Sequence, residues 1–175
     1  LFAYSVSKMV KGLKLLSLQD DLTGTGNRRA FGEKLVEVIG RYKRLGHSAS
    51  LIYLDIDDFK QINDQFGHAA GDEVLKCVSN TLLSTLRQTD KVFRLGGDEF
   101  VVISDGAVEN DAMLLAEKVK SKLDSVGSKI SPSVSVSIGV AQLSNEDDAD
   151  GWVARADQAL YQAKREGKHQ VQLAK

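Results

Sequence analysis

Apolar residues recur at the three- and four-residue spacing of a helix in four long segments of the chain. The first segment begins after Asn27, a residue type that caps helices, and it ends near Gly46. We expect the other three helices over residues 70–87, 110–126 and 152–166. Each presents an apolar stripe, so each is expected to pack against a common core.

Shorter apolar runs between these segments predict the strands of a sheet. Residues 50–54 form a continuous run that indicates a buried strand, and residues 92–103 predict a hairpin around Gly96-Gly97. Residues 133–140 alternate serine with valine or isoleucine, which places the aliphatic side chains on the core face and the serines on the other. Residues 170–173 predict a short final strand.

The order of these elements is strand, helices, hairpin, helix, strand and helix, without an internal repeat. Such an order predicts an α+β fold, with helices on one side of an antiparallel or mixed sheet. The chain has 175 residues, which suits one domain with a substantial core. We place that domain at residues 20–175.

Residues 1–19 form a separate leader. Its apolar residues follow a 4-3-4-3 spacing, the seam pattern of a coiled coil, but extend over only about two heptads. A single amphipathic helix that packs on its own domain therefore stays open as an alternative. The seam residues are Phe2, Val6, Met9, Leu13 and Leu16.

Composition narrows the classes of partner. The chain is 42% hydrophobic and 27% charged, and 23 basic against 24 acidic residues give a net charge of −1. This balance provides no overall basic field, so we expect no nucleic-acid partner. The single cysteine, Cys77, excludes an internal disulfide and fits a reducing compartment.

The early apolar stretch is interrupted by Lys8, Lys11 and Lys14 and is far shorter than a membrane span, and it does not resemble a signal peptide. The chain begins at Leu1 and not at a methionine, which indicates a fragment. We therefore expect a cytoplasmic domain of a longer protein, in which a membrane anchor upstream stays open.

Three carboxylates stand where a sheet would bring them together. Asp55 ends the first predicted strand, whereas Asp98 and Glu99 lie at the tip of the hairpin. Carboxylate oxygens are the ligands that Mg²⁺ prefers, and Gly96-Gly97 would let a nucleotide approach the backbone. Taken alone, however, an acidic hairpin tip is more often a solvated turn.

The surrounding motifs remove this ambiguity, because they occur in the order and at the spacings of one known family. Together they resemble the GGDEF family of diguanylate cyclases over about residues 20–170. The matching runs are Asp21-Leu22-Thr23-Gly24, Asn27-Arg28, residues 55–64, Gly67-His68, Gly71-Asp72, residues 94–100, residues 137–140, Ala156-Asp157, residues 159–161 and Ala163-Lys164.

The resemblance implies a fold similar to the polymerase palm and the nucleotidyl cyclases, with a central antiparallel sheet flanked by helices. It implies an enzyme, a nucleotidyltransferase that condenses two GTP into cyclic di-GMP and two pyrophosphates. By resemblance, Asp55, the Ile56 carbonyl and Asp98 bind Mg²⁺, for which Mn²⁺ can substitute. Glu99 assists with the metal or with the 3′-hydroxyl. Asp98, Glu99 and Lys60 are the expected catalytic residues.

The substrate contacts are implied in the same way. Asn63 and Asp72 match the pair that reads guanine, whose adjacent N–H donors suit a carboxylate, and His68 matches a position near the nucleotide. Lys168 replaces the family's arginine, so it keeps the charge and loses the bidentate fork. The expected phosphate-binding residues are Phe59 and Lys60 through their amides, with the side chains of Lys60, Lys164 and Lys168.

Arg87 and Asp90 fit the family's RxxD inhibitory site, which binds the product cyclic di-GMP. The alternative is a surface salt bridge at a helix end.

The resemblance also implies the partners. Two domains face each other so that each 3′-hydroxyl attacks the other's GTP, which makes the enzyme a homodimer, and a sensory domain precedes this fragment. Two other functions stay open: a non-catalytic module that binds cyclic di-GMP, and a cyclase that makes a hybrid cyclic dinucleotide.

Overall fold

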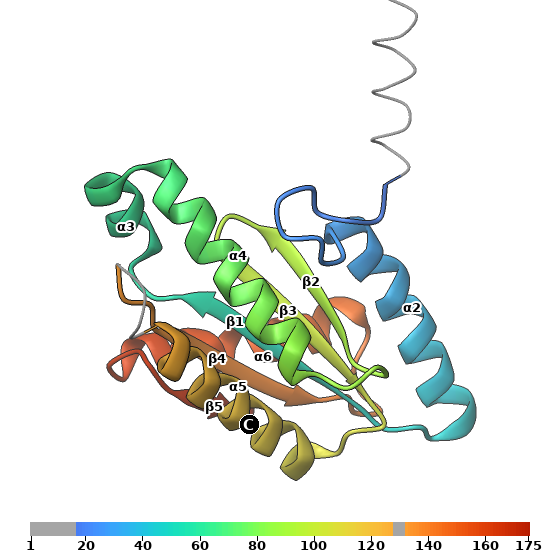
Figure 1. The fold of residues 1–175 in the computed structure, drawn as a ribbon. Helices are drawn as coiled ribbons and strands as arrows, with labels where there is room; N and C mark the ends of the chain where they lie inside the picture. The colour runs from blue at the N-terminus through green and yellow to red at the C-terminus, as the bar shows by residue number, and fades with distance from the viewer. Residues whose placement is uncertain (1–16, 128–131) are drawn as a thin grey trace, which may run out of the picture.

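A computed structural model describes residues 17–127 and 132–175, which form five strands and five helices around one sheet (Figure 1). The sheet order is β2-β3-β1-β4-β5. In chain order the elements are α2 (Arg28–Leu45), β1 (Ala49–Ile56), α3 (Phe59–Phe66), α4 (His68–Thr85), β2 (Lys91–Gly96), β3 (Glu99–Asp105), α5 (Glu109–Gly127), β4 (Val136–Gln142), α6 (Ala149–Arg165) and β5 (Val171–Leu173).

The central strand is β1, and all eight of its residues are buried. It pairs antiparallel with β3 on one side and with β4 on the other, and β2 continues the sheet beyond β3. Only β5 is parallel to its neighbour, β4. The predicted α+β fold with a largely antiparallel central sheet is therefore confirmed.

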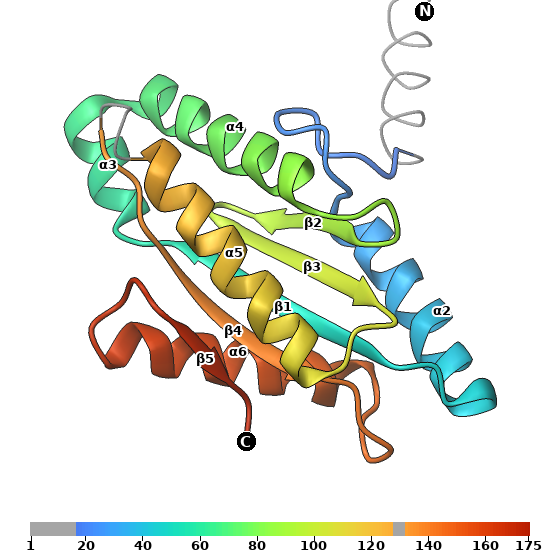
Figure 2. The same ribbon diagram turned by 60° about the horizontal axis from the view of Figure 1, so that its bottom comes forward.

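Helices cover both faces of the sheet, so the prediction that they lie on one side is wrong. Helices α4 and α5 lie over one face, whereas α2 and α6 lie over the other (Figure 2). The cause is visible in β1, where successive residues such as Ile52 and Tyr53 join opposite cores. An apolar run without alternation is typical of a strand that is covered on both faces.

The serine face of β4 is buried as well, because α6 packs closely on it. Ser137 is fully buried, and a methyl group added at Gly139 would come within 2.2 Å of the Ala156 carbonyl oxygen. Trp152 is also fully buried, and its indole N–H donates to the Ala141 carbonyl at 2.9 Å. Glycine at position 139 thus sets the distance between α6 and the sheet.

The helices agree with the sequence expectation to different degrees. Asn27 caps α2 by accepting from the Ala30 N–H, and Gly46 ends it in the left-handed conformation, as predicted. Helix α4 begins at His68 and ends at Thr85, two residues before the expected bounds at both ends. Helix α3 was not predicted, because its eight residues are too few to show a clear period.

Residues 19–27 run beside the outer strand β2. Gly26 forms a parallel bridge with Phe93, its N–H donates to the Val92 carbonyl, and its own carbonyl accepts from the Arg94 N–H at 2.8 Å. The predicted coiled-coil seam lies outside the described residues. No helix in the described ranges is long and apolar enough to span a bilayer.

Candidate active site

The predicted acidic residues meet where the central strand β1 ends and β3 begins. The register places Asp55 of β1 directly opposite Glu99 of β3, and the Ile56 N–H points at the Asp98 carbonyl at 3.4 Å. Burial, partly opposed by the hydrogen bond and charge of Lys164, acts together with the charges of Asp98 and Glu99 to raise the pKa of Asp55 to about 6. The pairing of β1 with β3 of the hairpin thus brings together three carboxylates from distant parts of the chain.

The donor set suits a magnesium ion that is held jointly with a substrate. Within the described residues, no three His, Cys, Asp or Glu side chains are arranged to hold a metal on their own. Mg²⁺ is usually bound by one or two carboxylates together with water and substrate phosphates. Asp55 and Asp98, with the Ile56 carbonyl, are the residues expected to form that smaller set of oxygen ligands.

Lys164 brings a cation from α6 to this edge. Its Nζ lies 2.9 Å from Asp55 Oδ1, and a cavity of about 350 Å³ opens beside it between Glu99 and α6.

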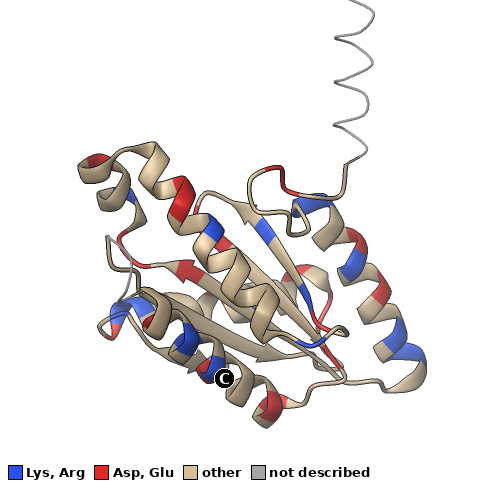
Figure 3. Cartoon of the chain, viewed as in Figure 1, with Lys and Arg blue, Asp and Glu red and all other residues tan. Residues whose placement is uncertain are grey.

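Acidic residues mark the end of β1, whereas charges of both signs are spread along α2 and α5 (Figure 3). The mixed surface agrees with the absence of an overall basic field in the sequence.

The turn between β1 and α3 presents free backbone donors. Asp58 has a φ of 56°, and its side chain does not cap α3, whose first amides belong to Phe59 and Lys60. The first amides of a helix lack carbonyl partners within the helix and suit an anion such as phosphate. Lys60 is exposed on the first turn, and Lys168 reaches this turn through Asp58 Oδ1 at 2.6 Å.

The residues expected to read the base lie on two adjoining helices. Asn63 of α3 packs against Gly71 of α4, where an added methyl group would come within 2.0 Å of the Asn63 side-chain oxygen. Gly71 therefore brings Asn63 next to the exposed Asp72. His68 is also exposed, at the first position of α4. Both predicted base-reading residues thus border one region between α3 and α4.

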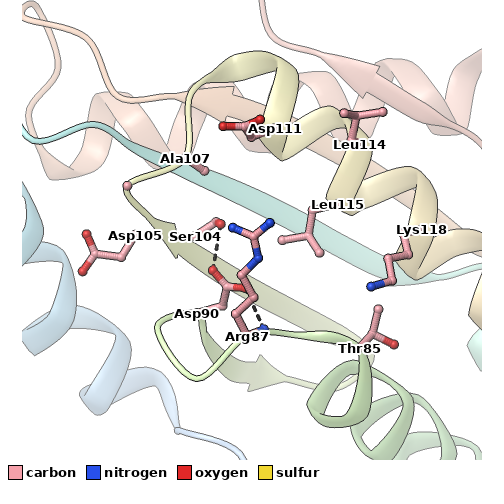
Figure 4. Close-up of a pocket in the computed structure, with 11 residues that line it drawn as sticks. Thr85, Arg87, Asp90, Ser104, Asp105, Ala107, Asp111, Leu114, Leu115 and Lys118 are labelled. Carbon is pink, nitrogen blue, oxygen red and sulfur yellow. Dashed lines mark hydrogen bonds between the residues drawn. The ribbon is translucent and has the colours of Figure 1, made fainter.

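Arg87 and Asp90 border a second cavity of about 230 Å³, on the α5 side of the molecule. Asp90 is buried, and its two carboxylate oxygens accept from the Ser104 hydroxyl at 2.8 Å and from the Arg87 backbone N–H at 2.9 Å. The Arg87 guanidinium points into the cavity, and Lys118 of α5 lines its far side (Figure 4). Within the described residues the two side chains form no ion pair, so the salt-bridge alternative is not what the structure contains.

A family profile described as "Diguanylate cyclase, GGDEF domain" matches residues 17–170. The chain belongs to this family. The resemblance seen in the motifs is therefore confirmed, and the family is one of diguanylate cyclases.

Relatives and solved structures agree with the assignment. Diguanylate cyclase DgcS from Shewanella oneidensis is 40% identical over 162 residues, which cover 93% of this chain and 54% of the relative. The crystal structure of diguanylate cyclase SiaD with its activator SiaC from Pseudomonas aeruginosa has a TM-score of 0.86 at 34% identity, covering 99% of this chain and 69% of that one. The coiled coil and GGDEF domain of DgcB from Caulobacter crescentus, in complex with c-di-GMP, also has a TM-score of 0.86, at 27% identity, covering 98% of this chain and 95% of that one. This GGDEF domain thus spans about half of its curated relative DgcS.

The structure adds a residue to the GGDEF hairpin that the motifs did not single out for a role. Arg94 donates two hydrogen bonds to the Gly97 carbonyl, at 3.0 and 2.8 Å, and contacts both oxygens of Asp20 at 3.1 and 3.3 Å. Burial opposes ionisation of Asp20, but hydrogen bonds from Thr23 and Arg94 outweigh it and lower the pKa of this carboxyl. Arg94 therefore fixes the glycine turn to residues 19–27.

Proposed function

We propose that this domain is a working diguanylate cyclase that condenses two GTP into cyclic di-GMP with release of two pyrophosphates. The observation that carries the proposal is that Asp55, Asp98 and Glu99 lie together beside Lys164, where β1 ends and β3 begins. Phosphoryl transfer needs the attacking oxygen, the phosphorus and the leaving group in line, with cations on the phosphates. The domain has residues for each of these tasks.

The expected roles follow the position of each group. Asp55, Asp98 and the Ile56 carbonyl would hold Mg²⁺, or Mn²⁺ in its place, and the ion would supply positive charge on the phosphates. The amides of Phe59 and Lys60, with the side chains of Lys60, Lys164 and Lys168, would bind the triphosphate. Glu99 would accept the proton of the 3′-hydroxyl or orient it.

A second copy of the domain is needed for the reaction. The described residues contain one acidic edge and therefore bind one GTP, whereas the product joins two. We infer a homodimer in which each 3′-hydroxyl attacks the α-phosphorus held by the other copy. The heptad spacing in residues 1–19 would bring the copies together by raising their effective concentration, under the control of a preceding sensory domain.

Incubation of the chain with GTP and Mg²⁺, followed by separation of the products by mass, tests this function. We expect cyclic di-GMP and pyrophosphate. Binding of cyclic di-GMP without any turnover would instead identify a non-catalytic module. Incorporation of ATP in a mixture of the two nucleotides would identify a hybrid cyclase.

Replacement of Asp72 by Ala should narrow the preference for GTP over ATP. A carboxylate accepts both adjacent N–H groups of guanine, and its loss should cost about 1–3 kcal/mol of discrimination. The measurement is kcat/KM for each nucleotide, with Asp64→Ala on the exposed surface of α3 as the matched control. An unchanged ratio would show that Asp72 does not read the base.

We also propose that cyclic di-GMP binds in the cavity beside Arg87 and thereby inhibits the enzyme. Arg87 and Lys118 offer two cations to the two phosphates, while the buried Asp90 holds the Arg87 turn in place. The DgcB relative was solved in complex with c-di-GMP. A ligand here can act at a distance if it has different affinities for productive and unproductive arrangements of two domains.

Replacement of Arg87 by Ala should weaken the binding of cyclic di-GMP by about ten- to a hundredfold, because a charge-assisted contact is lost. The initial rate should change little, since Arg87 lies outside the GTP site. Calorimetric titration of the product and progress curves for both proteins make the comparison, with Arg29→Ala on α2 as control. Product binding and inhibition equal to the parent's would refute the inhibitory role.

A further inference from the structure

Asp57 is a buried carboxylate that directly follows β1, the strand that carries Asp55 and Ile56. Its side chain accepts hydrogen bonds from the Ser137 hydroxyl at 2.7 Å, the Ser135 hydroxyl at 2.9 Å and the His169 backbone N–H at 3.2 Å. An ionised carboxylate only accepts hydrogen bonds, so it suits a position that is surrounded by donors. Asp57 thus joins β1, the chain before and within β4, and the turn after α6.

The first consequence concerns the carbonyl of Ile56, a proposed metal ligand. The Asp57 N–H donates to the Ser135 carbonyl at 2.9 Å, toward the β4 side of β1. In a planar trans peptide the C=O points opposite to the N–H. The Ile56 carbonyl is therefore directed toward the β3 side, where Asp98 and Glu99 lie.

The second consequence concerns the turn after α6. Lys168 and His169 both have left-handed backbones, with φ of 62° and 52°, which residues with side chains rarely adopt. The His169 N–H donates to both Asp57 and the Ser137 hydroxyl oxygen, at 3.2 Å each, and Asp57 also accepts from that hydroxyl, so the three groups together hold this turn against the sheet. From there, Lys168 pairs with Asp58. Asp58 also has a left-handed backbone, and it directly precedes the Phe59 and Lys60 amides at the start of α3.

We propose that Asp57 is a positioning residue that holds the Ile56 carbonyl and the Lys168–Asp58 contact in the geometry that binds a metal–triphosphate unit. This inference rests on the proposed function, because it assigns a support to that same site. Asp57 itself touches neither the metal nor the nucleotide. Its contribution is transmitted through the peptide on one side and through the turn on the other.

The decisive variants are Asp57→Ala and Asp57→Asn. Alanine removes all three accepted hydrogen bonds and should weaken metal binding by about ten- to a hundredfold, as is typical for a residue that orients metal ligands. The affinity of the Asp57→Asn variant for the metal should stay within about threefold of the parent's, because only one hydrogen bond must be rearranged. Its amide oxygen can accept from Ser135 and His169, while its NH₂ group donates to the Ser137 hydroxyl.

The measurement is Mn²⁺ binding in the presence of 3′-deoxy-GTP, followed by electron paramagnetic resonance. This nucleotide lacks the attacking hydroxyl, so the readout is independent of turnover. Asp147→Ala is the matched control, because Asp147 is also 7% exposed and accepts several hydrogen bonds, but lies before α6 and away from the carboxylates. It should lower stability without changing Mn²⁺ affinity.

The possible results separate this inference from the proposed function. If the parent does not bind Mn²⁺ with 3′-deoxy-GTP, the proposed site itself is refuted. If the parent binds and Asp57→Ala binds equally well, only the role of Asp57 is overturned. Should Asp57→Ala fail to fold, Ser135→Ala decides: about threefold weaker Mn²⁺ binding supports the role, and unchanged binding overturns it.

Discussion

Asp98→Asn and Glu99→Gln are each expected to slow the cyclisation of GTP by about a hundred- to a thousandfold. Each change replaces a charged oxygen by a neutral amide of nearly the same shape. The negative charge that would attract the metal or the 3′-hydroxyl proton is lost, whereas the hairpin retains its backbone pairing. The effect should therefore fall on chemistry and leave folding intact.

Initial rates of cyclic di-GMP formation at saturating Mg²⁺ measure the loss, with thermal unfolding of each variant recorded in parallel. Glu117→Gln, an exposed carboxylate on α5, is the matched control and should keep the parent rate. Parent-like turnover by Asp98→Asn or by Glu99→Gln would remove that residue from the mechanism. Slow turnover together with a large fall in unfolding temperature would point to folding as the cause.

Gly139→Ala should destabilise the domain by about 3 kcal/mol or more, which is the upper range for overpacking of a core. The added methyl group would come within 2.2 Å of the Ala156 oxygen and 2.3 Å of the Leu160 nitrogen. Both contacts are with backbone atoms, so no side chain can move aside. Helix α6 would have to shift, and Lys164 would shift with it, away from Asp55.

Urea unfolding of both proteins measures the change in the free energy of unfolding. The control is Gly32→Ala on the exposed face of α2, where an added methyl group meets nothing within 4 Å. Because alanine is more favourable than glycine in a helix interior by about 0.8–1 kcal/mol, this control substitution should raise the free energy of unfolding. Equal stability of Gly139→Ala and the parent would show that α6 can repack.

Much of the fold could be predicted because the signals were local. Asn27 and Gly46 bound α2 as helix-capping rules require, and Gly96-Gly97 turns the hairpin with φ of 140° and 52°. The second covered face was missed, although the unbroken apolar run of β1 is the pattern of a strand that is buried on both faces. Helix α3 was missed because two turns carry too little periodicity.

The candidate site divides in the same way. The motifs named Asp55, Asp98 and Glu99, and the hairpin packs beside β1 as the expected convergence requires, with Asp55 opposite Glu99. The supports of the site come from the pairing of distant segments: Asp57 binds Ser137, 80 residues away, and Arg94 binds Asp20, 74 residues away. No spacing rule predicts such pairs, because they depend on how the strands and turns are assembled.

The bridge between Gly26 and Phe93 has a consequence for how two domains can meet. An outer strand with free N–H and C=O groups is a template for strand addition and aggregation. Here residues 19–27 occupy part of the outer side of β2, and the opposite edge is β5, a strand of only three residues. Within residues 17–127 and 132–175, neither border of the sheet offers a long row of free backbone groups. If two copies associate as proposed, we therefore expect side chains, and not added strands, to form the contact between them.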